Sequence, residues 1–185
     1  METSTLIFIT GGARSGKSTF AERTAASLAK KERCSLHYIA TSRPADEEME
    51  QRIRRHKEQR MESGFEWKTW ECPTDLNAVV SHFGPKDIVL LDCLTILLAN
   101  ELFSDRHKEE QVMEAILPPI ADLKNRCRAL VIVSNEVLNE PLQGQLPTLT
   151  YARLLGRLHR ELVQRAAAAY LVEAGIPVLM KGIKP

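Results

Sequence analysis

The sequence has no surplus of charge of either sign and no long apolar run. Its 25 lysines and arginines are balanced by 24 aspartates and glutamates, for a formal net charge of +1 at pH 7. Proteins that bind nucleic acid or membrane surfaces usually carry a basic excess, so this balance argues against both classes. A membrane-spanning helix needs about eighteen or more consecutive apolar residues. Because no such run occurs, the sequence predicts no membrane span.

Paired cysteines and a leader segment are also missing. The four cysteines form no C-x-x-C pair, which excludes the common zinc and redox motifs; they are Cys34, Cys72, Cys93 and Cys127. Free thiols in a cytoplasm are the simplest expectation for this pattern. The first residues, METSTLIFIT, contain no basic segment before the apolar stretch, so we expect no signal peptide. Without repeats or low-complexity segments, residues 1–185 are expected to form a single domain.

What the sequence does contain is a phosphate-binding motif. The apolar run 6–10 leads into GGARSGKS at 11–18, which matches the P-loop pattern between a predicted strand and a predicted helix. Glycines let backbone N–H groups approach phosphate oxygens, and the following helix adds its positive end. Lys17 can reach the β- and γ-phosphates, and Ser18 can bind Mg²⁺. A chance match by a glycine-rich turn is the competing interpretation, but the flanking strand and helix favour a true P-loop. The predicted cradle consists of Gly12, Ala13, Arg14, Ser15, Gly16, Lys17, Ser18 and Thr19.

Apolar stretches alternate with helical patterns along the rest of the chain. Buried strands are predicted at 6–10, 36–40, 88–92 and 130–134, short strands at 170–172 and 178–180, and a weaker strand at 65–71. Helices are predicted at 17–31, 46–61, 76–83, 94–103, 107–125 and 150–169, with a loop at 138–147. We expect Pro118-Pro119 to break or kink the fifth of these helices. This alternation predicts an α/β fold with a mostly parallel sheet and a short antiparallel pair of strands at its C-terminal end.

Polar residues follow three of the predicted strands. Thr41-Ser42 follows 36–40, Asp92 ends 88–92, and Asn135-Glu136 follows 130–134. The carboxyl ends of parallel strands meet at one edge of the sheet, where ligands bind. An apolar run that ends in Asp downstream of a P-loop is typical of a Walker-B acid, which helps to hold Mg²⁺. Asp92 could also serve as the N-cap of the next helix, and the two roles are compatible.

The helix predicted at 46–61 carries one residue that differs from its neighbours. Most of its charges form favourable i,i+4 pairs, such as Glu48 with Arg52, and suit a solvated helix. His56 instead shares a face with Met49 and Ile53. From spacing alone, a lone histidine on such a face is more often a packed core residue than a functional one.

Several nucleotide-binding classes do not fit the motifs. Asp92-Cys93-Leu94-Thr95 is not D-x-x-G, and no N-K-x-D motif is present, so a switch GTPase is not expected. The length suits a small-molecule kinase better than a motor ATPase. Six pieces occur in order: ITGGARSGKSTFAE at 9–22, YIATS at 38–42, EMEQRIRRHKEQR at 48–60, WKTWECPTDL at 67–76, VLLDCLTILLANELF at 89–103 and VIVSNEV at 131–137. Together they resemble the bifunctional adenosylcobinamide kinase / adenosylcobinamide-phosphate guanylyltransferase family of cobalamin biosynthesis.

The resemblance implies a RecA-like P-loop fold, a homotrimer and two linked reactions. Members phosphorylate the aminopropanol hydroxyl of adenosylcobinamide with ATP or GTP. They then transfer GMP from GTP to adenosylcobinamide phosphate through a GMP–histidine intermediate, which gives adenosylcobinamide-GDP. The family's histidine precedes Lys in R-I-x-x-H-K, and this position is His56 here. A neutral imidazole is nucleophilic near neutral pH, and a covalent intermediate divides one transfer into two displacements.

The resemblance also implies roles for residues around the nucleotide. Mg²⁺ and Lys17 would stabilise the pyrophosphate leaving group, and Lys57 and Arg60 can balance triphosphate charge. By resemblance, four further residues are expected to contact the nucleotide: Thr41, Ser42, Arg43 and Glu71. For Arg43, ordinary loop polarity explains the residue nearly as well. Asp92 could orient or deprotonate the acceptor alcohol, or it could hold only the metal.

Two segments depart from the family pattern. The G-x-G-I-V-P segment expected after Val137 reads LNEPL here, and the R-D-x-x-G-x-x-N segment keeps Gly156 but has His159 at the Asn position. These positions are expected to shape the corrinoid site and the subunit contacts. The alternatives are therefore a P-loop kinase of another small molecule with one of the two activities, and a nucleotide-binding regulatory module.

Overall fold

The protein is described here by a computed structural model. It describes residues 4–43, 47, 51, 54, 57, 58, 60, 64–104, 106–136 and 146–182, with only the main chain of residues 146 and 147. The predicted helix at 46–61 therefore lies largely outside the described residues, and so does most of the predicted loop at 138–147.

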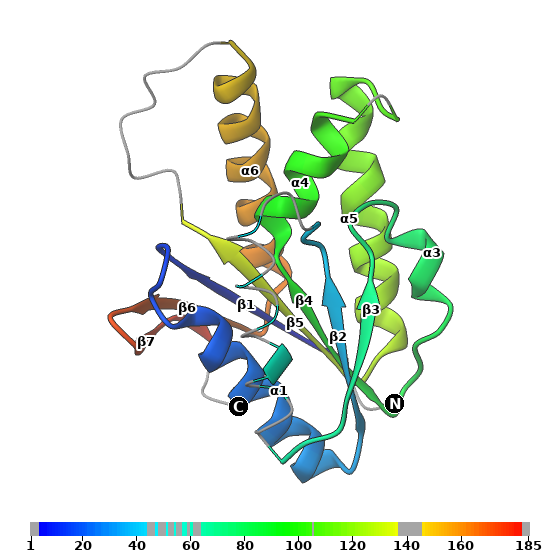
Figure 1. The fold of residues 1–185 in the computed structure, drawn as a ribbon, viewed down its shortest axis with the longest axis vertical. Helices are drawn as coiled ribbons and strands as arrows, with labels where there is room; N and C mark the ends of the chain where they lie inside the picture. Colours follow the sequence, from blue (N-terminus) through cyan, green and yellow to red (C-terminus); the bar gives the residue numbers. More distant parts are fainter. Residues whose placement is uncertain are drawn as a thin grey trace.

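Seven strands form a single sheet in the order β3-β2-β4-β5-β1-β6-β7 (Figure 1). Their bounds are β1 Thr5–Gly11, β2 Ser35–Ala40, β3 Trp67–Glu71, β4 Asp87–Asp92, β5 Ala129–Asn135, β6 Ala168–Glu173 and β7 Ile176–Gly182. Every neighbouring pair is parallel except β6 and β7, which pair antiparallel. The structure thus confirms the predicted mostly parallel sheet with an antiparallel pair at its C-terminal end.

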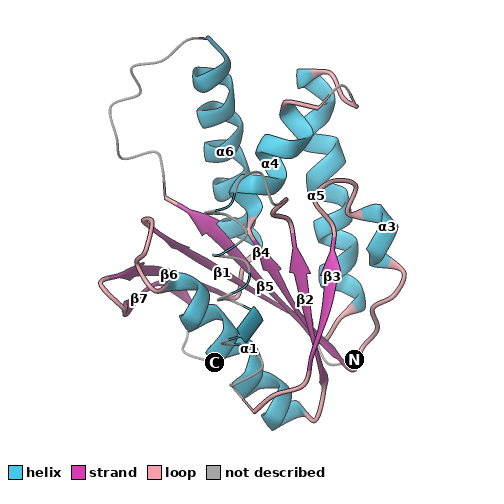
Figure 2. Cartoon of the chain, viewed as in Figure 1, coloured by secondary structure: helices cyan, strands magenta, loops and turns pink. Residues whose placement is uncertain are grey.

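The helices cover the two faces of the sheet unequally (Figure 2). Their bounds are α1 Lys17–Glu32, α3 Asn77–Val80, α4 Leu94–Leu102, α5 Glu109–Arg126 and α6 Leu146–Arg165. Helix α1 packs on one face, where its alanines meet Ile7 and Ile9 of β1. Helices α3 to α6 cover the other face, where Phe8 belongs to the core. This division follows from the alternation of side chains along a strand, which sends neighbouring residues to opposite faces.

Helices α5 and α6 differ from the prediction, α5 in its continuity and α6 in its C-terminal end. Helix α5 runs through Pro118 and Pro119, so of the two predicted effects the break is wrong, and the kink stays a prediction. Helix α6 ends at Arg165 instead of Ala169, because Ala168 pairs with Ile7 in the β6–β1 ladder. Pairing with β1 thus outweighs the high helix propensity of alanine at these positions.

Candidate nucleotide site

The strand register gathers the predicted polar residues at one edge of the sheet. Asp92 lies opposite Ala40, and Ala40 lies opposite Glu71, while Gly11 lies opposite Asn135. The N–H of Thr41 donates to the carbonyl of Asp92 at 3.1 Å, and the N–H of Glu136 donates to the carbonyl of Gly11 at 2.9 Å. The ends of four parallel strands therefore stand level with the start of the P-loop, as predicted.

The P-loop is a tight turn that depends on its glycines. A Cβ at Gly11 would lie 2.4 Å from the carbonyl oxygen of Val172 and 2.5 Å from Oγ of Ser15. Gly16 adopts φ of 88°, which an L side chain rarely tolerates, and the next residue begins α1. Lys17 is buried and its Nζ donates to the carbonyl of Gly12 at 3.0 Å. These contacts hold the lysine beside the loop that would cradle the phosphates.

The side-chain hydroxyl of Ser15 indicates that the P-loop is shaped for a ligand. Its side chain is buried, yet among the described residues its Oγ has no hydrogen-bond partner. A buried hydroxyl without a partner costs about 1–3 kcal/mol. A phosphate oxygen would satisfy this donor, so the observation agrees with the phosphate-binding role predicted for the loop.

The turn between β6 and β7 braces the P-loop from outside. The N–H of Gly175 donates to the carbonyl of Ser15 at 2.8 Å. Gly175 has φ of 80°, and its Cα lies 3.3 Å from the place that a Cβ on Gly16 would take. The two glycines therefore allow two sharp turns to touch.

Asp92 is held by a neighbouring strand. The hydroxyl of Tyr38, on β2, donates to Oδ2 of Asp92 at 3.0 Å. Burial raises the pKa of Tyr38 well above its ordinary value, and Asp92 adds to the rise, so the phenol remains a donor at neutral pH. The N-cap of α4 is Cys93 instead of Asp92, and it has no side-chain cap bond. The prediction that Asp92 caps this helix is therefore wrong.

Arg60 is buried and already engaged with two neighbours. Its guanidinium stacks 3.7 Å from the centroid of the Tyr38 ring, and its Nη1 lies 3.3 Å from Oε1 of Glu22 on α1. Burial raises the pKa of Glu22, and Arg60 opposes this rise. Arg60 thus links its own segment to α1 and to Tyr38. Its predicted contact with the triphosphate stays a prediction.

Thr41 has a structural use that the sequence did not suggest. Its side chain is fully buried, and its Oγ1 both accepts from the N–H of Cys93 at 2.8 Å and donates to the carbonyl of Cys93 at 2.9 Å. Burial raises the pKa of the Cys93 thiol to about 11, with Asp92 adding to the rise and Lys17 opposing it. The Thr41 hydroxyl therefore joins the ends of β2 and β4, and its predicted contact with the nucleotide stays a prediction.

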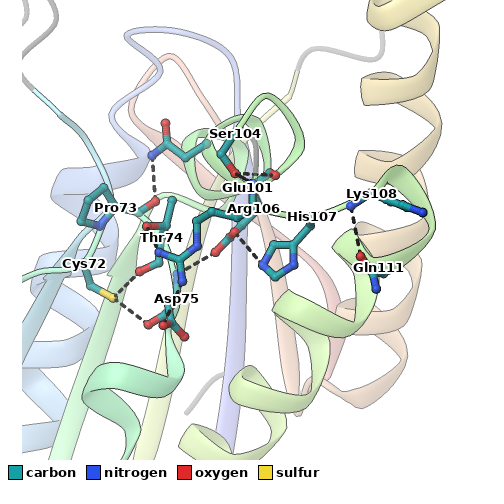
Figure 3. Close-up of polar contacts among 11 residues, drawn as sticks. Cys72, Pro73, Thr74, Asp75, Glu101, Ser104, Arg106, His107, Lys108 and Gln111 are labelled. Atoms are coloured by element: carbon teal, nitrogen blue, oxygen red, sulfur yellow. Dashed lines mark hydrogen bonds and ion pairs between the residues drawn. The ribbon is translucent and has the colours of Figure 1, made fainter.

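Helix α4 holds the loops that follow β2 and β3 (Figure 3). Nδ2 of Asn100 donates to the carbonyls of Thr41 and Pro73 at 2.9 and 2.8 Å. The fully buried Glu101 accepts from the N–H of Asp75 at 2.6 Å, and its other oxygen lies 3.4 Å from Nε2 of His107. Two successive residues of one helix therefore fix two strand ends of the site.

The remaining predicted site residues lie at the surface or outside the described residues. Arg43, Lys57 and Glu71 are exposed, and Nζ of Lys57 lies 3.4 Å from Oε1 of Glu71. Ser42 is half-buried. His56 is outside the described residues, so its predicted role as nucleophile stays a prediction.

The end of β5 contacts α6 through a histidine. Oγ of Ser134 lies 2.8 Å from Nε2 of His159, and the His159 ring meets Phe8 edge to face at 5.2 Å between centroids. Burial lowers the pKa of His159, and Glu136 opposes this effect. The residue that departs from the family pattern is thus packed directly behind the strand end that precedes the altered segment.

Ser18 and Asp92 fit the predicted Mg²⁺. The described residues contain no cluster of three or more histidine, cysteine or acidic side chains that could hold a metal ion. Mg²⁺ does not need one, because it is usually bound by one or two protein ligands together with substrate phosphates and water. Ser18 at the start of α1 and Asp92 at the end of β4 carry the hard oxygen donors that this ion prefers, and their ligation of Mg²⁺ stays a prediction.

The four cysteines are free, as predicted. Among the described helices, none is long and apolar enough to cross a membrane.

These features define the class of protein: a P-loop NTPase fold of the RecA type. The fold resembles a DnaB-like replicative helicase, with a TM-score of 0.57 at 12% identity over 96% of this chain and 55% of that one. It also resembles a separately solved ATPase domain, with a TM-score of 0.53 at 14% identity over 92% of this chain and 70% of that one.

Sequence comparison identifies the family within this class. The family model "Cobinamide kinase / cobinamide phosphate guanyltransferase" matches residues 7–180. The bifunctional adenosylcobalamin biosynthesis protein CobU of Escherichia coli is 33% identical over 95% of this chain and 99% of its own length. CobP of Pseudomonas aeruginosa is 36% identical over 94% and 96%. The chain belongs to the cobinamide kinase / cobinamide phosphate guanyltransferase family.

Sequence reasoning missed four residues that shape the site: Glu22, Tyr38, Asn100 and Gly175. Glu22 follows Ser18 by one helical turn, so its place on the same face of α1 could have been found from spacing. Tyr38 reaches Asp92 only through the register between β2 and β4, and Asn100 reaches Thr41 and Pro73 only through the placement of α4 beside the strand ends. Gly175 lies between the short strands predicted at 170–172 and 178–180, but nothing in the sequence linked it to the P-loop.

Proposed function

We propose that the chain phosphorylates adenosylcobinamide with ATP or GTP and then transfers GMP from GTP to the product, giving adenosylcobinamide-GDP. The observation that carries this proposal is the family match, which spans residues 7–180. The P-loop, with its buried lysine and its unpartnered Ser15 hydroxyl, supports the nucleotide-binding part.

In the kinase step, Lys17 would hold the β- and γ-phosphates while the acceptor hydroxyl attacks the γ-phosphorus. Asp92 would orient or deprotonate that hydroxyl, or hold the metal. Ser18, and Asp92 if it serves the metal, would hold a Mg²⁺ ion, which would supply electrostatic stabilisation of the developing charge. A new P–O bond forms to the acceptor as the bond to the β-phosphate oxygen breaks.

In the transfer step, we place His56 as the nucleophile. Its imidazole nitrogen attacks the α-phosphorus of GTP, and pyrophosphate leaves as the P–N bond forms. A phosphate oxygen of adenosylcobinamide phosphate then attacks the same phosphorus, and the P–N bond breaks to give back the free histidine. Lys57, exposed beside Glu71, is available to balance charge on the triphosphate.

Covalent labelling tests the transfer step. Incubation with Mg²⁺ and GTP labelled at the α-phosphate should give an acid-labile, alkali-stable adduct that is lost in His56→Ala. His82→Ala, which removes an exposed histidine, is the matched control and should label as the wild type does. Folded wild-type protein that takes no label would contradict the transferase half.

One observation favours a second candidate, a kinase with only one of the two activities. The segment after Val137 departs from the family pattern at the place expected to shape the corrinoid site. Transfer of the γ-phosphate without any α-label would favour that kinase, and tight nucleotide binding without turnover of adenosylcobinamide would favour a regulatory module. The homotrimer implied by the resemblance belongs to the same proposal, and analytical ultracentrifugation tests it.

A further inference from the structure

The hydroxyl of Tyr38 connects Asp92 to a buried set of contacts on the α1 side of the sheet. It donates to Oδ2 of Asp92, and the face of its ring carries the guanidinium of Arg60. Arg60 in turn pairs with Glu22 on α1. Tyr38 and Arg60 are only 6% and 4% exposed. Contacts therefore run without interruption from the helix behind the P-loop to the carboxylate at the end of β4.

The position of Tyr38 on β2 explains why it can reach this carboxylate. In the β2–β4 ladder Tyr38 lies opposite Leu90, and Ala40 lies opposite Asp92. Residues two apart on a strand share a face, so Tyr38 lies one step below Asp92 on the α1 side. Its ring meets Trp67 and Arg60 without using the hydroxyl. A phenylalanine would make the same ring contacts, so among the described residues the hydroxyl serves Asp92.

We propose that Tyr38 is a positioning residue that fixes Asp92 for Mg²⁺, and that Arg60 holds the Tyr38 ring in place for this task. The inference rests on the proposed function and, of the roles proposed there for Asp92, on the one in which it holds Mg²⁺. It adds two residues of this chain that act through Asp92 and not on the metal itself.

The chemistry of Mg²⁺ makes such positioning useful. The ion demands nearly ideal octahedral geometry, at about 2.0–2.1 Å from each ligand. An aspartate carboxylate turns easily about its last torsion, so a ligand that is not held must be ordered when the metal binds. The bond from Tyr38 fixes Oδ2 and leaves the other oxygen for the metal. Partners of this kind typically change metal affinity by about 10–100-fold.

The test compares Tyr38→Phe with Tyr170→Phe, which removes the hydroxyl of another buried tyrosine, on β6, away from Asp92. GTP affinity is measured by calorimetry in EDTA and at rising Mg²⁺ concentration. For Tyr38→Phe we expect about a tenfold rise in the Mg²⁺ concentration that gives half of the maximal change in GTP affinity. The GTP affinity measured in EDTA should not change. Tyr170→Phe should match the wild type in both measurements.

A double-substitution cycle shows whether Tyr38 acts through Asp92. In protein that already carries Asp92→Asn, adding Tyr38→Phe should change the Mg²⁺ response no further. If Tyr38→Phe does not fold, Arg60→Lys provides the second variant, since it keeps the charge near Glu22 but removes the planar group from the ring. It should raise the Mg²⁺ requirement in the same direction by a smaller factor.

The outcomes separate this inference from the proposed function. A wild-type Mg²⁺ requirement in folded Tyr38→Phe, or in Arg60→Lys if it replaces that variant, would overturn the positioning role while the nucleotide site stands. If the GTP affinity of the wild-type protein does not depend on the Mg²⁺ concentration, this result would overturn the proposed metal site and the inference with it.

Discussion

At the scale of single residues, Lys17 carries the clearest expectation. Its Nζ lies beside the P-loop carbonyl of Gly12, inside a buried environment. A hydrogen bond to a charged group contributes about 1.5–3 kcal/mol, so Lys17→Ala should weaken binding of GTP and ATP by about ten- to a hundredfold. Isothermal titration calorimetry measures this. Lys30→Ala, an exposed lysine on the same helix, should bind as the wild type does; equal affinities of the two variants would contradict the role of Lys17.

His159 leads to a prediction about pH. Burial lowers its pKa in the folded protein below the ordinary value of 6.5. The unfolded chain therefore binds a proton more readily, so folding stability should fall as the pH drops below about 6.5 toward the lower folded pKa. Urea unfolding from pH 7.5 to 5 should show this loss, and His159→Asn should reduce its slope over this range. An unchanged slope in the variant would assign the pH dependence to other groups.

At the scale of elements, α4 connects the strand ends that form the site. Glu101 is fully buried and accepts from the N–H of Asp75 in the loop after β3. Glu101→Ala leaves this donor without its partner, so we expect the free energy of unfolding in urea to fall by about 1–3 kcal/mol. Glu114→Ala, on the exposed side of α5, is the control and should change it little. If the two substitutions lower the free energy of unfolding equally, the buried contact between Glu101 and Asp75 adds nothing to stability.

The elements themselves could largely be predicted, but some of their ends could not. The apolar runs predicted the positions of the strands, because a strand that is buried on both faces is apolar throughout and shows no alternating pattern. The P-loop motif predicted the start of α1, because a helix begins at the lysine and serine of the motif. The end of α6 was missed because alanines favour a helix locally, whereas Ala168 pairs with Ile7 of β1. The break predicted at the proline pair in α5 was also wrong, because the packing of that helix on the core outweighs the lost hydrogen bonds.

The site was predictable only where its residues lie in motifs. Lys17, Ser18 and Asp92 follow from the P-loop and from the strand that ends in a carboxylate. Tyr38 could not be predicted as a partner of Asp92, because their contact depends on the register between β2 and β4. Likewise, no spacing in the sequence reveals that the buried Thr41 bonds to Cys93 and Asn100.

At the scale of the whole molecule, the C-terminal pair of strands should influence phosphate binding. Gly175 donates its N–H to Ser15, and its φ of 80° disfavours any side chain. Gly175→Ala should disturb this brace and weaken GTP binding several-fold, as a fluorescent GTP analogue can measure. Gly64→Ala is the matched control, because Gly64 also has a positive φ and open space around it. If both variants bind equally well, the brace does not matter for nucleotide.

The bond between Gly175 and Ser15 also orders events during synthesis. Ser15 leaves the ribosome well before the β6–β7 hairpin that braces it, because the hairpin follows it in the sequence. Until then β1 lacks β6, one of the two strands that flank it in the finished sheet. A nascent chain can therefore carry the complete P-loop motif before the strand and the turn that support it have been made.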